Sequence, residues 1–246
     1  MIIDSDHDYR VLAPPRCFSV AKTNDYRNED ARSISHRLEV SALSDGASVS
    51  FDSAAWATIL VRRYVRNPRF DWAWLSGAIA EFAKLYDRES LPWMQQASFD
   101  RGSFASLLGV THLGAGVVRV LAVGDSIAVL CDGDRILSSF RYSSPNQFDQ
   151  RPQLLSTNIV ENAFVDDLQL EEFYTTWNLQ EYDRPALLCM TDALGQWVLT
   201  RVDEEVSPVT VLRELRSLAA FRHFVAEERA AGRMRRDDTT LLAYWR

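Results

Sequence analysis

Four aspartates lie where an apolar run of this sequence meets a turn, an arrangement suited to metal-dependent chemistry. Such runs predict strands, and the end residues of a strand lie at the rim of its sheet. Carboxylates that meet at one rim repel one another and raise their pKa values unless a cation neutralises them. Oxygen ligands favour Mg²⁺ or Mn²⁺ over zinc, and none of the four histidines lies in these runs. The acids are Asp45 after LEVSALS, Asp125 after VVRVLAVG, Asp192 after PALLCMT, and Asp237 before DTTLLAYW.

Each acid also has an ordinary structural interpretation. Asp45 and Gly46 form a turn dipeptide, and Asp125 fits a turn between two strands. Asp237 and Asp238 follow the basic run RMRR, which fits a solvated charge run or a local ion pair. From these residues alone, metal binding and the structural interpretations both stay open.

The elements that must position the acids follow from hydrophobic periodicity. Alternation predicts early strands at residues 16–21 and 38–43, and helical spacing predicts helices at 52–65 and 71–86, the second capped by Asp71. Apolar runs separated by turns predict further strands between residues 104 and 140 and at 186–190 and 239–245. A helix is expected to begin at Ser207-Pro208 and to stop near Gly232. Residues 141–181 are polar and irregular, which predicts a surface flap that sets specificity.

The order of the short motifs resembles the metal-dependent protein phosphatases of the PPM (type 2C) family, in a bacterial-type, single-domain form. The resemblance spans residues 18–244 and implies an α+β fold, a four-layer αββα sandwich of two antiparallel β-sheets flanked by helices. It implies one catalytic domain over residues 1–246, with residues 141–181 as a flap insertion. The matching residues are Asn28-Glu29-Asp30-Ala31, Leu43-Ser44-Asp45-Gly46, Val123-Gly124-Asp125-Ser126, Leu188-Cys189-Met190-Thr191-Asp192 and Asp237-Asp238-Thr239-Thr240-Leu241-Leu242.

The resemblance implies a protein serine/threonine phosphatase that uses a metal-activated water to hydrolyse phosphoserine and phosphothreonine. Its cofactors would be two Mn²⁺ or Mg²⁺ ions, with a third in many members. Its partner would be a phosphorylated protein substrate, so the enzyme would oppose a serine/threonine kinase. By position, the resemblance implies that Asp45 bridges two ions and that the Gly46 carbonyl ligates one of them. Asp192 and Asp237 would complete the first ion, and Glu29 would serve the second ion. Asp125 would help hold the third ion, and Asp30 would support the bound water.

The sequence departs from the family pattern where the phosphate is gripped. Asp25 stands where many members have an arginine, so Arg27 is a catalytic candidate, with Lys22 as another; the ordinary interpretation of Arg27 is a surface arginine. Ala193 replaces a usual glycine, and Ala47 leaves no histidine to protonate the leaving group. These departures leave an alternative open, a catalytically weak phosphatase-like regulatory domain that binds phosphoprotein.

Composition and charge argue against several other classes of protein. The net charge of −7 disfavours a nucleic-acid or anionic-lipid surface, and therefore a two-metal nuclease. The sequence has no apolar stretch of about 18 residues and no signal-peptide pattern at its start. Its three cysteines have no zinc or redox spacing. We therefore expect a cytoplasmic protein with reduced cysteines and no membrane partner.

Overall fold

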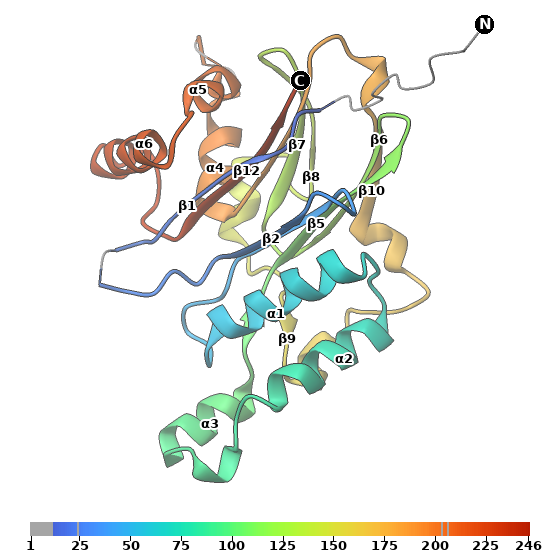
Figure 1. The fold of residues 1–246 in the computed structure, drawn as a ribbon. Coiled ribbons are helices and arrows are strands. Elements are labelled where there is room, and N and C mark those ends of the chain that lie inside the picture. The colour runs from blue at the N-terminus through green and yellow to red at the C-terminus, as the bar shows by residue number, and fades with distance from the viewer. Residues whose placement is uncertain (1–11, 24, 203, 206) are drawn as a thin grey trace, which may run out of the picture.

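The computed structural model describes residues 12–23, 25–202, 204–205 and 207–246. In this part of the chain, two five-stranded antiparallel sheets lie face to face, and helices cover both outer faces (Figure 1). The predicted αββα sandwich is therefore confirmed. None of the helices described is long and apolar enough to cross a membrane.

The first sheet gathers strands from both ends of the chain. Met190, at the end of one central strand, pairs with Ile127 on one side and Leu241 on the other. The end of that strand therefore lies beside the starts of its two neighbours. In spatial order the strands are β1 (Arg16–Val20), β12 (Thr239–Trp245), β11 (Pro185–Met190), β7 (Ile127–Asp132) and β8 (Arg135–Phe140).

The second sheet has the same organisation at its corresponding edge. Ala31 pairs with Ser44, and Leu107 pairs with Val123, so two strand ends and two strand starts share one rim. In spatial order the strands are β10 (Tyr174–Asn178), β6 (Val117–Val123), β5 (Leu107–Gly114), β3 (Val40–Ser44) and β2 (Ala31–Ser35). A short ladder joins β4 (Phe104–Ala105) to β9 (Leu155–Ser156).

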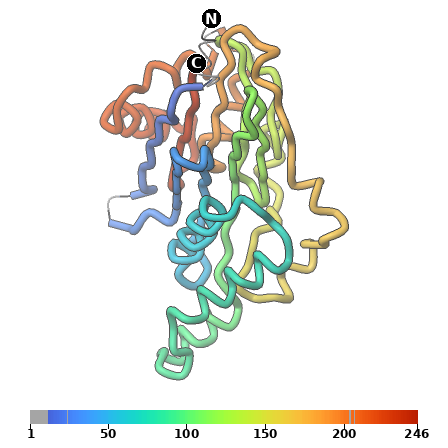
Figure 2. The backbone as a smooth tube through the Cα atoms, turned by 45° about the vertical axis from the view of Figure 1, so that its right-hand side comes forward, coloured from blue at the N-terminus to red at the C-terminus, as the bar shows by residue number. Residues whose placement is uncertain are grey.

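Helices form the two outer layers. Figure 2 shows α1 and α2 stacked over the second sheet, with the α3 segment extending beyond them. The helices are α1 (Ser53–Arg66), α2 (Trp72–Ala83) and α3 (Trp93–Arg101) on this side, and α4 (Asp192–Thr200), α5 (Pro208–Glu214) and α6 (Leu218–Ala230) on the side of the first sheet. Short 3₁₀ turns are η1 (Arg88–Ser90), η2 (Pro145–Asp149), η3 (Ile159–Asn162), η4 (Leu170–Phe173) and η5 (Leu179–Glu181).

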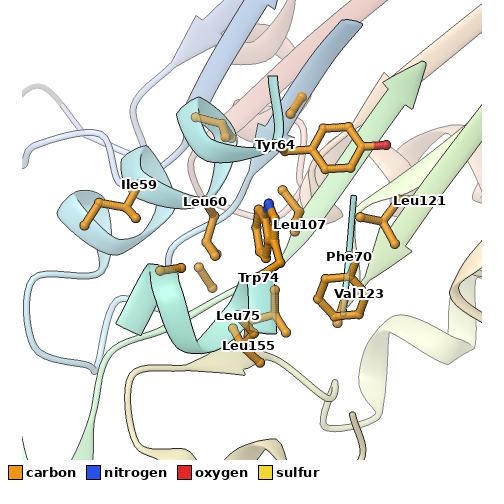
Figure 3. Close-up of a cluster of buried hydrophobic side chains, with 14 of the residues drawn as sticks. Ile59, Leu60, Tyr64, Phe70, Trp74, Leu75, Leu107, Leu121, Val123 and Leu155 are labelled. Carbon is orange, nitrogen blue, oxygen red and sulfur yellow. The ribbon is translucent and has the colours of Figure 1, made fainter. Parts of the chain in front are cut away.

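Three buried apolar clusters hold these layers together. One lies between α1, α2 and the second sheet, where Leu60 and Leu75 pack near Leu107 (Figure 3). Another lies between the two sheets and includes Leu108 and Leu242, and a third lies under α4 to α6. Each fully buried side chain of this size contributes roughly 1.5–3 kcal/mol. This packing holds the helices against the sheets and the sheets against each other, so the rim residues lie on a defined scaffold.

Several elements differ from the sequence predictions. Asp71 and Ser207 cap helices as expected, each accepting a backbone hydrogen bond. The helix expected from Ser207 to Gly232 is broken, because Ser217 caps a new helix by accepting from the Ala220 N–H. Strand β2 and helices α3 and α4 were not predicted. Strand β10 lies within the segment read as irregular and pairs with β6.

Candidate active site

The strand-terminal aspartates lie at the same rim of the sandwich. Asp45 directly follows β3, and Asp125 lies in the turn between β6 and β7. Asp192 begins α4 just after β11, and Asp237 precedes β12. The strand pairing explains this, since the end of β11 lies beside the start of β12, where the Thr191 N–H donates to the Thr240 carbonyl at 3.2 Å. Both sheets therefore supply carboxylates to one place.

Asp45 lies at the centre of this group. Burial raises its pKa well above the ordinary value, and the charges of Asp30, Asp192, Asp125 and Asp237 raise it further. Its side chain shares a hydrogen bond with that of Asp192. Two bonds fix its backbone, because the Asp45 N–H donates to Ser106 Oγ at 3.0 Å and the Ser106 N–H donates to the Asp45 carbonyl at 2.9 Å. A carboxylate held this way is stable only with a proton or a cation nearby.

Asp30 has one satisfied and one unsatisfied carboxylate oxygen. Oδ2 accepts hydrogen bonds from Thr240 Oγ1 at 2.6 Å and Thr191 Oγ1 at 3.2 Å. Oδ1 is buried and has no partner among the described residues. Burial raises the pKa of Asp30 well above its ordinary value, and the charges of Asp238 and Asp192 raise it further. The hydrogen bond from Thr240 lowers this pKa but does not offset the other effects. A buried oxygen without a partner is rare and costly, so Oδ1 is a place for a water or a ligand.

Asp125 and Asp192 are buried acids with different neighbours. Burial raises the pKa of Asp125 to about 7, and the charge of Asp192 adds to this. Burial also raises the pKa of Asp192, but the guanidinium of Arg235 opposes that shift. Arg235 Nη2 lies 2.7 Å from Asp192 Oδ2. Asp192 is therefore partly neutralised by the chain itself, whereas Asp45 has only acidic neighbours among the charges that shift it.

Glu29 is already paired with a cationic side chain. Its Oε2 accepts from Lys22 Nζ at 2.7 Å and its Oε1 accepts from Ser53 Oγ at 2.7 Å. Burial raises the pKa of Glu29, but the hydrogen bonds from Lys22, Ser48 and Ser53 outweigh it, and the pKa lies below the ordinary value. Glu29 is therefore ionised. It can serve a metal ion only in competition with Lys22.

Gly46 is required by a close backbone approach. A Cβ atom on this residue would lie 2.8 Å from the carbonyl oxygen of Glu29, which is closer than real Cβ contacts, and at a tight 3.0 Å from Ser53 Cβ. The Asp45-Gly46 turn and the Glu29 backbone are therefore packed directly together. The Asp238 carboxylate fixes the same loop, accepting from the N–H groups of Lys22 at 2.6 Å and Glu29 at 2.5 Å.

Arg27 lies on the surface, whereas Arg235 lies against one of the rim carboxylates. Arg27 lies with its Nη1 3.6 Å from Asp52, and its side chain is 71% exposed. The position of Arg235 was not predicted, because the RMRR run also fits an ordinary solvated surface. Its guanidinium lies over the Phe148 ring at 5.8 Å from the centroid, and its Nε and Nη2 are buried without a hydrogen bond of ordinary geometry to a described residue. The useful sequence signal was two arginines directly before a strand-terminal acid.

The donors at this rim fit a hard divalent cation in chemistry and charge. They are carboxylate oxygens, several have raised pKa values, and Asp30 Oδ1 is buried without a partner. As the side chains are placed, however, no three acidic, histidine or cysteine residues in the described part of the chain are arranged to hold a metal ion. The Asp45 side chain instead shares a hydrogen bond with Asp192, and Arg235 lies against Asp192. Metal binding therefore requires these side chains to turn toward a common centre.

Comparison with known proteins identifies the fold. No protein-family model matches the sequence. No curated protein matches it either. A solved structure of the Mycobacterium tuberculosis serine/threonine phosphatase PstP/Ppp is similar, with 14% identity and a TM-score of 0.59 over 96% of this chain and 99% of that chain. The catalytic domain of PstP in complex with 2 manganese ions gives 13% identity and a TM-score of 0.58 over 95% and 98%. PppA of Pseudomonas aeruginosa, a key regulatory component of T6SS, gives 18% identity and a TM-score of 0.54 over 95% and 98%.

Proposed function

We propose that this chain, which has the fold of the PPM-type bacterial serine/threonine phosphatases, is a Mn²⁺- or Mg²⁺-dependent protein phosphatase that hydrolyses phosphoserine and phosphothreonine. The supporting observation is the buried group of carboxylates around Asp45, whose mutual repulsion calls for cations. We further propose that residues 1–246 act as one catalytic domain. Residues 1–11 lie outside the described residues.

In this proposal each acid keeps the role that the resemblance implies. Bound ions of this kind lower the pKa of a water and offset charge on phosphoryl oxygens. The protein holds them with oxygen ligands and keeps the surrounding backbone fixed. The proposed ligands are Asp45 and the Gly46 carbonyl, Asp192, Asp237, Glu29 and, for a third ion, Asp125.

Asp30 is proposed to hold the attacking water. Its Oδ1 is free to accept a hydrogen bond, while two threonine hydroxyls hold Oδ2 in place. Its raised pKa suits it to accept a proton from that water. Thr191 directly follows β11 and Thr240 lies in the neighbouring strand β12, so the orientation of Asp30 is set by this edge of the first sheet.

Arg235 is the proposed phosphate-binding residue, in place of Arg27. It lies against Asp192, and a guanidinium binds phosphate oxygens in a bidentate geometry. When cations neutralise Asp192, Arg235 becomes available to a substrate anion. Arg235→Gln is therefore expected to raise KM for a phosphothreonine peptide by about tenfold or more, since charge-assisted hydrogen bonds of this kind are lost. Steady-state kinetics with Mn²⁺ measure this.

Arg236 offers the matched control for that prediction. It is the neighbouring arginine and its side chain is exposed. Arg236→Gln removes the same charge from the same segment and is expected to leave KM nearly unchanged. Equal effects of the two variants would mean that general charge, and not contact with phosphate, explains the result.

One observation favours the alternative function, a phosphatase-like domain that binds phosphoprotein without efficient turnover. Lys22 Nζ lies 2.7 Å from Glu29 Oε2 and neutralises Glu29, the residue expected to serve the second ion. If this ion pair persists, the site holds fewer cations and hydrolysis is slow. Phosphopeptide binding would then remain while turnover is lost.

Hydrolysis of p-nitrophenyl phosphate with a Mn²⁺ titration tests the proposed function. The proposal predicts turnover that rises with Mn²⁺ and stops with EDTA. Absence of turnover in folded protein that still binds a phosphopeptide would favour the regulatory alternative. Cleavage of nucleic acid with no action on phosphopeptides would identify a nuclease and contradict both.

A further inference from the structure

A groove of about 940 Å³ lies beside the acidic rim. Its lining comes from three segments that are distant in sequence, namely residues 47–50, 98–104 and 151–164. The middle segment is the end of α3 and the start of β4, and the last lies within the segment predicted to be a flap. The size is that of an ordinary ligand site, which ranges from about 300 to 1,000 Å³.

Two contacts connect this groove to the carboxylates. Ala47 lines it, lies two residues after Asp45, and donates its N–H to the Phe104 carbonyl at 2.9 Å. Leu154 lines the opposite wall and packs on Gly124, where an added Cβ would lie 3.0 Å from Leu154 Cδ2. Gly124 directly precedes Asp125. The groove therefore meets the rim beside both Asp45 and Asp125.

The groove has a local positive charge in an acidic protein. Arg101 and Arg151 line it, both are exposed, and neither side chain pairs with an acidic residue of the described chain. Asp100 is neutralised, because Arg88 Nε donates to its Oδ1 at 2.6 Å. Glu161 is the remaining acid of the lining. Two arginines against one acid leave a net positive surface, although the whole chain has a net charge of −7.

Apolar side chains complete the lining. Val49 is 94% exposed, and Phe104 and Phe164 are partly buried in the walls. Exposed apolar groups beside unpaired arginines suit a peptide that carries both apolar and acidic side chains. Nucleic acid is a poor match for a chain with a net charge of −7, which offers no extended basic surface to a phosphate backbone.

We propose that this groove binds the residues of a phosphoprotein substrate that flank the phosphorylated residue, and that Arg101 and Arg151 select substrates with acidic side chains there. The inference rests on the proposed phosphatase function and names its substrate class. Complementary charge at an exposed surface gives specificity and faster association more than raw affinity, so each arginine has a modest effect. Reversing both charges converts attraction into repulsion and gives the clearest signal.

The test compares the double variant Arg101→Glu, Arg151→Glu with the wild type on three substrates. These are a phosphothreonine peptide with glutamates on both sides, the same peptide with glutamines there, and p-nitrophenyl phosphate. We expect KM for the acidic peptide to rise about tenfold, with little change for the other two substrates. The small substrate has no flanking residues, so its turnover reports on the acidic rim alone.

A second double variant, Arg216→Glu with Arg222→Glu, provides the matched control. Both arginines are exposed; Arg216 lies between α5 and α6, and Arg222 lies in α6. These helices are on the side of the first sheet, away from α3 (Figure 1). The change in net charge is the same. The proposal is overturned if the control raises KM for the acidic peptide equally, or if the groove variant raises KM for both peptides equally.

Direct binding separates failure of the groove from failure of the proposed function. Fluorescence anisotropy with the two labelled phosphopeptides needs no turnover. If the wild type prefers the acidic peptide and the groove variant loses that preference, the proposed role of the groove is supported even in an inactive protein. Equal wild-type affinity for the two peptides contradicts it even in an active one. Arg101→Gln with Arg151→Gln repeats the measurement if the glutamate variant does not fold.

Discussion

Asp45→Asn is expected to abolish turnover and also to stabilise the metal-free protein. Turnover should fall about 10³-fold, because the proposed bridging ligand stabilises transition-state charge by several kcal/mol through the ions. Without metal, the same change removes the cost of burying or protonating a carboxylate that Asp30, Asp192, Asp125 and Asp237 repel. Relief of about 1 kcal/mol corresponds to a rise of about 2–4 °C in Tm for a chain of this size. Kinetics with Mn²⁺ and thermal unfolding with EDTA measure the two effects.

The opposite signs of these effects make the prediction specific. An ordinary loss of a structural residue lowers both activity and stability. Asp183→Asn is a suitable control, because Asp183 is exposed and lies just before β11, at the end of that strand opposite Asp192. It is expected to change neither quantity. An Asp45→Asn protein that is active, or that is less stable than the wild type in EDTA, would contradict the proposed role of Asp45.

The metal-free protein is expected to lose stability as the pH rises from about 4 to above 7. The pKa of Asp125 is raised from an ordinary 3.8 to about 7, and those of Asp30 and Asp45 are also raised. The folded state therefore binds more protons than the unfolded state across this window, and its free energy of unfolding falls with increasing pH. For Asp125 alone the loss is at most about 4 kcal/mol. Glu29, with a lowered pKa, acts in the other direction only below its ordinary value of 4.5.

Mn²⁺ is expected to remove this pH dependence. A bound cation stabilises the ionised carboxylates, so the stability gained from metal should be small near pH 5 and large near pH 8. Urea unfolding at several pH values, with EDTA or with Mn²⁺, measures the difference. A flat profile in EDTA would show that the acids do not interact as the structure indicates.

The positions of the aspartates were predictable because they depend on local pattern. Each follows or precedes an apolar strand, and the strand alternation that places Asp45 or Asp192 at a rim is a property of the neighbouring residues. The caps at Asp71 and Ser207 were predictable for the same reason. The fold class came from the order of the motifs, because that order resembles a family whose members share this sandwich.

The contacts that distinguish this site were not predictable, because they join residues distant in sequence. Arg235 lies against Asp192 only because β11 and β12 are neighbours, and nothing in the RMRR run specifies that partner. Lys22 and Glu29 are close in sequence, but the hydrogen bond from Ser53 that completes their contact comes from α1. The positive groove needs three separate segments, including α3, whose weak apolar pattern gave no helix signal.

The most direct test of the proposed metal-dependent phosphatase function is dephosphorylation of a phosphothreonine peptide. It is measured with and without Mn²⁺, in the wild type and in Asp192→Asn. Circular dichroism of both proteins establishes that they are folded. The proposed function predicts turnover that requires Mn²⁺ and is lost in the folded variant. Turnover that persists in Asp192→Asn, or a folded wild type that binds Mn²⁺ and releases no phosphate, would contradict it.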